Sequence, residues 1–197
     1  AGALDDFNRA IALDPGSEQT FFNRGALRRL MGDADGEIAD LNQALRINSR
    51  MIEAYNNRGA IRLSRGEWEA ALADFNQVLA INARYPSAYY NRALVQYARG
   101  NKAAAVSDLR RALELFDKVV VSANRMVQPN PRLVDAYLFY GNIKMDDGDT
   151  DGAIAEFNRA LEINSRSVAA LNNRGLAWHL KKDLDKAAAD YQQAIAL

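Results

Sequence analysis

The chain has 197 residues, of which 49% are hydrophobic and 25% charged, as in an ordinary globular protein with one sizeable domain. Lysine plus arginine equals aspartate plus glutamate at 25 each, so the sequence predicts neither nucleic-acid binding nor attraction to an anionic membrane. No apolar run approaches the ~20 residues needed for membrane insertion. The sequence has no cysteine, which excludes disulfides and thiolate sites but leaves cytosol and periplasm both open as compartments.

Helical periodicity, with apolar residues three and four apart, runs along the chain. A helix is predicted near 3–13, and five helical hairpins follow it. Their first helices are predicted near 18–31, 52–65, 86–99, 134–147 and 168–181, and their second helices near 34–47, 68–81, 102–124, 150–163 and 184–197. The chain starts at Ala1 without a methionine or a visible signal peptide. We therefore expect a fragment or processed form that opens half-way through a repeat.

A short motif marks each hairpin and returns after 34 residues, except for one step of 48. Its copies are Asn23-Arg24-Gly25, Asn57-Arg58-Gly59, Asn91-Arg92-Ala93, Phe139-Tyr140-Gly141 and Asn173-Arg174-Gly175. Other positions recur in step with it. These are an aromatic slot (Phe21, Tyr55, Tyr89, Tyr137), a turn glycine (Gly32, Gly66, Gly100, Gly148, with Lys182 departing), an alanine (Ala71, Ala105, Ala153, Ala187, with Glu37 departing) and a second aromatic or leucine (Leu41, Phe75, Leu109, Phe157, Tyr191).

This pattern resembles the tetratricopeptide repeat (TPR) family. The resemblance implies an all-α fold, a right-handed α-solenoid of antiparallel helix hairpins, in a single domain over 1–197. A partial repeat would occupy 1–17, full repeats about 18–51, 52–85, 86–116, 134–167 and 168–197, and an insertion about 117–133. In this frame Asp33, Glu67, Asn101, Asp149 and Asp183 are candidate caps of the second helices, and Trp68 and Trp178 are expected in the core.

Four repeats carry arginine in the motif and aspartate sixteen residues later, at Arg24/Asp40, Arg58/Asp74, Arg92/Asp108 and Arg174/Asp190. The fourth repeat has Tyr140 and Glu156 instead. One interpretation is a row of arginines for acidic ligands. The favoured one is an internal ion pair that fixes the register of each hairpin, with a contribution of only ~0–1 kcal/mol if the pair is exposed.

No constellation for catalysis, a metal or a cofactor is expected, and the chain is not predicted to be an enzyme. Asp147-Gly148-Asp149-Thr150-Asp151 resembles the start of a calcium loop, but the closing glutamate position holds Asn158. The repeat frame also places this segment at a helix start. His179 is the only histidine, and one histidine without cysteine builds neither a typical zinc site nor a convincing triad.

Partner binding is the function that the family resemblance implies, with the first helices lining a concave groove. The lysines of chaperone-tail clamps are not present as a set, whereas apolar and aromatic residues near asparagines suit a peptide partner. The predicted groove residues are Phe22, Arg29, Asn56, Leu63, Tyr90, Leu94, Tyr97, Leu138, Asn142, Met145, Asn172 and His179. The alternative is that some of these side chains pack between neighbouring repeats.

The insertion begins with Asp117-Lys-Val-Val-Val, which prolongs the preceding helix, and Pro129 and Pro131 are expected to stop it. It either changes the local superhelix or contacts a partner or second copy through Val119, Val120, Val121, Met126 and Val127. The leading hypothesis is thus a protein-interaction scaffold. The alternative is a self-assembling module that forms a homo-oligomer through repeat ends or residues 117–130.

Overall fold

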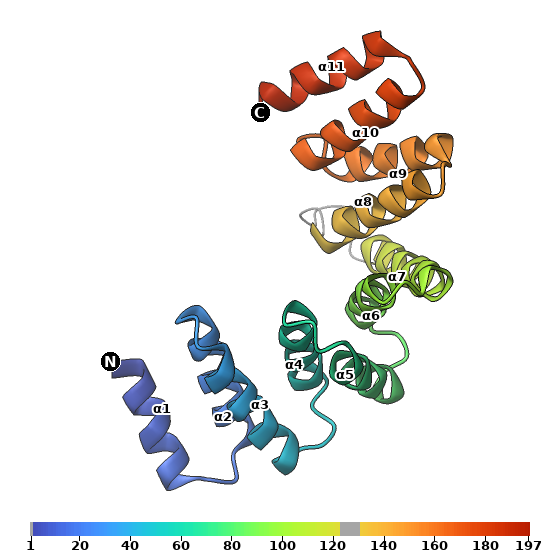
Figure 1. Cartoon of the computed structure of the whole chain (residues 1–197). Coiled ribbons are helices and arrows are strands. Elements are labelled where there is room, and N and C mark those ends of the chain that lie inside the picture. The colour runs from blue at the N-terminus through green and yellow to red at the C-terminus, as the bar shows by residue number, and fades with distance from the viewer. Residues whose placement is uncertain (1, 123–130) are drawn as a thin grey trace. The chain divides into compact units, whose positions relative to one another are not determined.

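The computed structural model of the protein describes residues 2–122 and 131–197, and for 117–122 it describes the backbone only. These residues form eleven α-helices and no strand (Figure 1). They divide into two compact units, Ala1–Val95 and Gln96–Leu197. The boundary falls within α6 (Pro86–Ala98).

The first unit contains five complete helices and most of α6. They are α1 (Gly2–Leu13), α2 (Glu18–Leu30), α3 (Ala34–Ile47), α4 (Ile52–Ser64) and α5 (Trp68–Ile81). Helices α2 and α3 pack as one hairpin, and α4 and α5 as the next. The core includes a cluster of Leu41, Leu45 and Ala54, and another of Ala71, Phe75 and Val95. Each cluster joins one hairpin to the first helix of the next.

The second unit contains the end of α6 and five further helices. They are α7 (Lys102–Ser122), α8 (Pro131–Asp146), α9 (Thr150–Ile163), α10 (Val168–Leu180) and α11 (Leu184–Ile195). Helices α8 and α9 form a hairpin, as do α10 and α11, and α10 also packs on α9. The cluster of Ala153, Ile154, Phe157 and Ala177 fills the space between these hairpins.

The all-α prediction is confirmed, and the start of each expected hairpin helix agrees with the structure except in α8. We expected Pro131 to stop a helix, but it is the first residue of α8. Proline suits that position because its missing N–H would have no intrahelical partner there and its φ angle is already helical. The side chains of the insertion valines and Met126 lie outside the described residues. The single solenoid domain over 1–197 stays a prediction.

The turns and caps explain why the hairpins recur. Gly32, Gly66, Gly100 and Gly148 take φ angles of 73–80°, where glycine has no steric penalty. Lys182 adopts the same conformation with φ of 62°. The carboxylates of Asp33, Asp149 and Asp183 accept hydrogen bonds from the backbone N–H three residues later, as predicted. Glu67 makes no such side-chain bond.

The tryptophans differ in their surroundings. Trp68 is 37% exposed at the first position of α5, so its predicted core role was wrong. Trp178 packs against the cluster around Phe157, and the Lys186 ammonium lies 4.3 Å from its ring centroid. Within residues 2–122 and 131–197, no helix combines the length and hydrophobicity that a bilayer-spanning segment needs.

Candidate functional site

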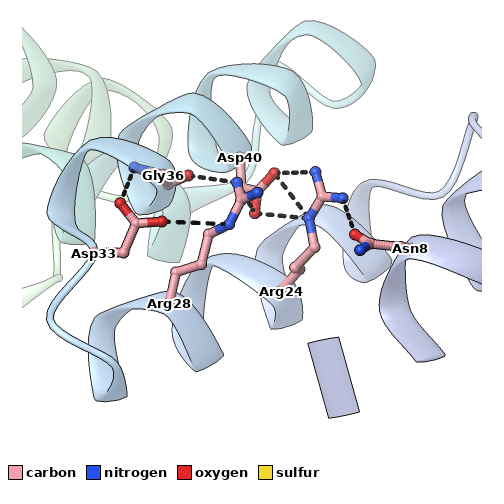
Figure 2. Close-up of polar contacts among 6 residues, drawn as sticks. All are labelled: Asn8, Arg24, Arg28, Asp33, Gly36 and Asp40. Carbon is pink, nitrogen blue, oxygen red and sulfur yellow. Dashed lines mark hydrogen bonds and ion pairs between the residues drawn. The ribbon is translucent and has the colours of Figure 1, made fainter. Parts of the chain in front are cut away.

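The recurring arginine of the motif forms hydrogen bonds and an ion pair with other residues of the chain. In the first repeat the guanidinium of Arg24 donates to both oxygens of Asp40, with Nε–Oδ2 at 3.0 Å and Nη2–Oδ1 at 2.6 Å (Figure 2). Asp40 is only 2% exposed, so its charge depends on such donors for compensation. This geometry favours the register-fixing ion pair over a row of arginines for ligands.

Two further residues complete this site, and the sequence reasoning missed both. Figure 2 shows Arg24 Nη1 donating to Asn8 of the preceding helix at 2.8 Å, and Arg28 Nη1 reaching Asp40 at 2.9 Å. The signal was available, because asparagine precedes the motif arginine by sixteen residues in four repeats. These asparagines are Asn8, Asn42, Asn76 and Asn158.

The same arrangement is repeated in both units. In the second repeat, Arg58 bonds Asp74 at 2.6 Å and Asn42 at 2.6 Å, and Arg62 bonds Asp74 at 2.8 Å. Arg174, Asp190 and Asn158 form the corresponding bonds in the fifth repeat. Arg92 also bonds Asn76 at 2.7 Å. In these four repeats the motif arginine therefore ties the hairpin to the helix before it.

The fourth repeat keeps a charge-compensated site with different residues. Arg110 occupies the asparagine position and donates from Nε to the Tyr140 hydroxyl at 2.9 Å. The buried carboxylate is now Glu156, and Lys144 pairs with it at 2.7 Å. Lys144 lies four residues after the motif position, as Arg28 and Arg62 do, so the buried carboxylate is paired without a motif arginine and Tyr140 and Glu156 are not an open binding feature.

Four predicted groove residues are half-buried and pack against core clusters. Phe22 contacts the cluster of Leu41, Leu45 and Ala54, and Leu63 contacts that of Ala71, Phe75 and Val95. Leu138 and Met145 pack against the cluster around Phe157. These contacts agree with the alternative that such residues join neighbouring repeats. The half-buried Tyr90 and Leu94 lie on α6, in the first unit.

Three predicted residues make side-chain bonds between repeats. Buried Asn56 accepts from Asn91 Nδ2 at 3.2 Å, which joins α4 to α6. Exposed Asn142 accepts from Asn173 Nδ2 at 3.0 Å, which joins α8 to α10. Tyr97 donates its hydroxyl proton to Asp146.

The Tyr97 side chain makes both a polar and an aromatic contact with α8. Its hydrogen bond to Asp146 is the largest cause that raises the pKa of the phenol above its ordinary value, and partial burial adds to the shift. Its ring also meets Phe139 edge-on at a centroid distance of 5.3 Å. Beside it, Lys102 pairs with Asp147 at 2.5 Å. These contacts fix the end of α6 and the start of α7 to the end of α8.

The exposed members of the predicted set are Arg29 in the first unit and Asn142, Asn172 and His179 in the second. Arg29 lies 3.6 Å from the buried carboxylate of Glu37. Two leucines outside the predicted groove set share the exposed face of α10: Leu176 is 45% and Leu180 is 56% exposed. Spacing of three to four residues places them beside Asn172 and His179. We call Asn142, Asn172, Leu176, His179 and Leu180 the α8/α10 face.

A cleft opens at the start of α8. Its volume is ≈ 400 Å³, and its lining residues are Pro131, Val134, Asp135, Leu138, Asn164, Ser167 and Ala169. Leu138 is a predicted groove residue, and Asp135 and Ala169 lie one helical turn before the predicted groove residues Leu138 and Asn172. The cleft therefore lies beside the predicted groove residues of the fourth and fifth repeats.

The segment that resembles a calcium loop uses its acids in other ways. Asp147 pairs with Lys102, Asp149 caps α9, and Asp151 forms an ion pair with Lys181. Within the described ranges 2–122 and 131–197, no three acidic or histidine side chains converge as a metal site would require.

Models of known protein families match three stretches of the sequence. Models described as "TPR repeat" and "Tetratricopeptide repeat" match residues 59–100, 86–118 and 134–197. The chain belongs to the tetratricopeptide repeat family. No curated protein matches the sequence significantly.

Several solved structures share the fold of this TPR chain. The crystal structure of MamA matches with a TM-score of 0.70 and 23% identity, over 87% of this chain and 92% of that one. The structure of YrrB, described as a TPR protein with an unusual peptide-binding site, matches with a TM-score of 0.68 and 20% identity, over 96% and 91%. Pseudomonas aeruginosa PilF matches with a TM-score of 0.76 and 14% identity, over 91% and 75%.

Proposed function

We propose that this TPR chain is a non-catalytic scaffold that binds a peptide segment of a partner protein on its first helices. The observation that carries the proposal is the α8/α10 face. There, two leucines about half-exposed lie beside asparagines that can hold the backbone of an extended peptide. The fold-level similarity to YrrB, with its peptide-binding site, supports the same function.

The two kinds of side chain on this face have complementary roles in the proposal. Leu176 and Leu180 would bury apolar side chains of the peptide, which gives affinity. Asn172 is exposed, and no partner within the described residues competes for its amide. Such an amide both donates to and accepts from a peptide backbone. The inward-packed residues Phe22, Leu63 and Met145 would instead hold the first helices in position.

The test is selection from a random-peptide library on the immobilised chain, followed by affinity measurement for an enriched peptide. Leu176→Ser should weaken binding about tenfold, because most of a leucine contact is lost. Leu13→Ser is the matched control, since Leu13 is also exposed but lies on α1. Absence of any enriched peptide, or equal affinity of the Leu176→Ser variant, would contradict the proposal.

Self-assembly is the second candidate function. Ile195 of α11 is 86% exposed, whereas Leu45, at the same repeat position, is 7% exposed and packs with Ala54 of the following first helix. A second copy could cover this surface. Light scattering across a concentration series separates the candidates: a constant monomer mass would refute self-assembly, and a mass that falls for Ile195→Ser would support it.

A further inference from the structure

Two clefts of the second unit differ in how their charges are compensated. The larger, of ≈ 800 Å³, runs along α7 and includes Lys102, Arg111, Glu114 and Asp147. Four of its charged side chains pair with one another, Lys102 with Asp147 at 2.5 Å and Arg111 with Glu114 at 2.6 Å. The remaining one, Arg110, donates to the Tyr140 hydroxyl at 2.9 Å, so every charged side chain of this cleft has a polar partner.

The smaller cleft, at the start of α8, holds one uncompensated charge. Asp135 is exposed, and among residues 2–122 and 131–197 no basic side chain or hydrogen-bond donor pairs with it. The two polar neighbours do not supply a counter-charge. Asn164 accepts from Arg166 N at 3.1 Å and Ser167 caps α10 through Ala170 N at 3.3 Å.

The rest of the lining is apolar and suits the stem of a long cationic side chain. Val134 is buried and Leu138 half-buried, and both lie next to Asp135 on the wall of the cleft. Lysine and arginine place their methylene groups on apolar surface while the charged end reaches a polar group. The same cleft would repel an acidic side chain.

We propose that this cleft binds a lysine or arginine side chain of the partner peptide, with the cation at the Asp135 carboxylate. The proposal rests on the peptide-binding function above and names the chemistry of the ligand. A basic residue followed by apolar residues would occupy first the cleft and then the α8/α10 face, which the Asn173–Asn142 bond makes continuous from α8 to α10. The partner segment is thus basic and apolar.

The experiment compares the peptides that the intact chain and its variants select from a random library. The wild type should enrich lysine and arginine beside apolar residues, and an enriched peptide should bind Asp135→Asn about tenfold more weakly. Asp135→Lys should shift the enriched residues to aspartate and glutamate. Asp185→Asn, an equal charge change near the start of α11, should select the same peptides as the wild type.

Each outcome decides the proposal. Peptides without a basic preference, acidic peptides, or an Asp135→Asn variant of unchanged affinity would overturn the cleft assignment while leaving peptide binding intact. No enriched peptide at all would overturn both. Circular dichroism of each variant confirms the helical fold, so that a lost preference reports on the carboxylate.

Discussion

Replacement of a motif glycine by alanine, made separately at Gly59 and at Gly25, should test how closely the two helices of a hairpin pack. Gly59 of α4 faces Phe75 of α5, and a Cβ at this position would lie 2.7 Å from Cε1 and 2.9 Å from Cζ of that ring. Phe75 is fully buried, so it has no free space to move into. Gly25, at the same position of α2, would place its Cβ no closer than 3.4 Å to a neighbour, the Cβ of Asp40.

The two variants separate helix propensity from packing. Alanine in place of a helical glycine stabilises by about 1 kcal/mol at either position. At Gly59 the overlap with the ring costs about 1–3 kcal/mol. Gly25→Ala should therefore be more stable than the wild type, and Gly59→Ala less stable than Gly25→Ala by about 1–3 kcal/mol.

Thermal and urea unfolding of the two variants measure this difference, at roughly 2–4 °C per kcal/mol for a chain of this size. A second change checks the cause. Phe75→Leu should recover stability in the Gly59→Ala background, because the first repeat combines Gly25 with Leu41 and tolerates a Cβ. Equal stability of the two alanine variants, or no recovery with leucine, would refute the packing argument.

Three further substitutions test the charges and turns. Asp74→Ala should destabilise by about 3 kcal/mol, because it leaves Arg58 and Arg62 without their shared buried carboxylate; an unchanged urea midpoint would contradict this. Burial raises the pKa of the Glu37 carboxyl above its ordinary value, and the positive charge of Arg29 lowers this pKa in part. The stability that the protonated carboxyl contributes is therefore complete below its unfolded pKa near 4.5, and it is lost as the pH rises through the folded pKa. Glu37→Gln should therefore raise the melting temperature at neutral pH and flatten its fall between acidic and neutral pH. Lys182→Gly should stabilise by about 1 kcal/mol by relieving the left-handed conformation, as measured by thermal unfolding.

The helices were predictable from the sequence because the same slots return at a fixed period. The start of α8 was the exception. Proline was read only as a residue that stops a helix, although Pro131 serves equally well as a first helical residue. Glu67, predicted as a cap together with the aspartates, makes no capping bond, because its longer side chain is a poor substitute for aspartate.

The exposure of a groove position was not predictable from its slot. Asn56 and Asn172 occupy the same repeat position, yet Asn56 is buried and Asn172 is exposed. The difference comes from the neighbouring helix, since Asn91 of α6 covers Asn56 and bonds to it. A single-repeat pattern carries no information about what the next repeat places over it.

The fourth repeat shows that the family pattern preserves charge balance rather than residue identity. A buried carboxylate is present at the same position in all five repeats, but in the fourth its cation comes from Lys144 instead of a motif arginine. Arg110 then occupies the place where other repeats put asparagine, and Tyr140 accepts its hydrogen bond. An arginine restored at Tyr140 alone would lie beside the Arg110 guanidinium, and the single carboxylate of Glu156 would then face three cations, whereas Asp74 pairs with two, Arg58 and Arg62. Residues 110, 140, 144 and 156 therefore form one group in charge balance, in which an arginine at position 140 requires a compensating change at Arg110.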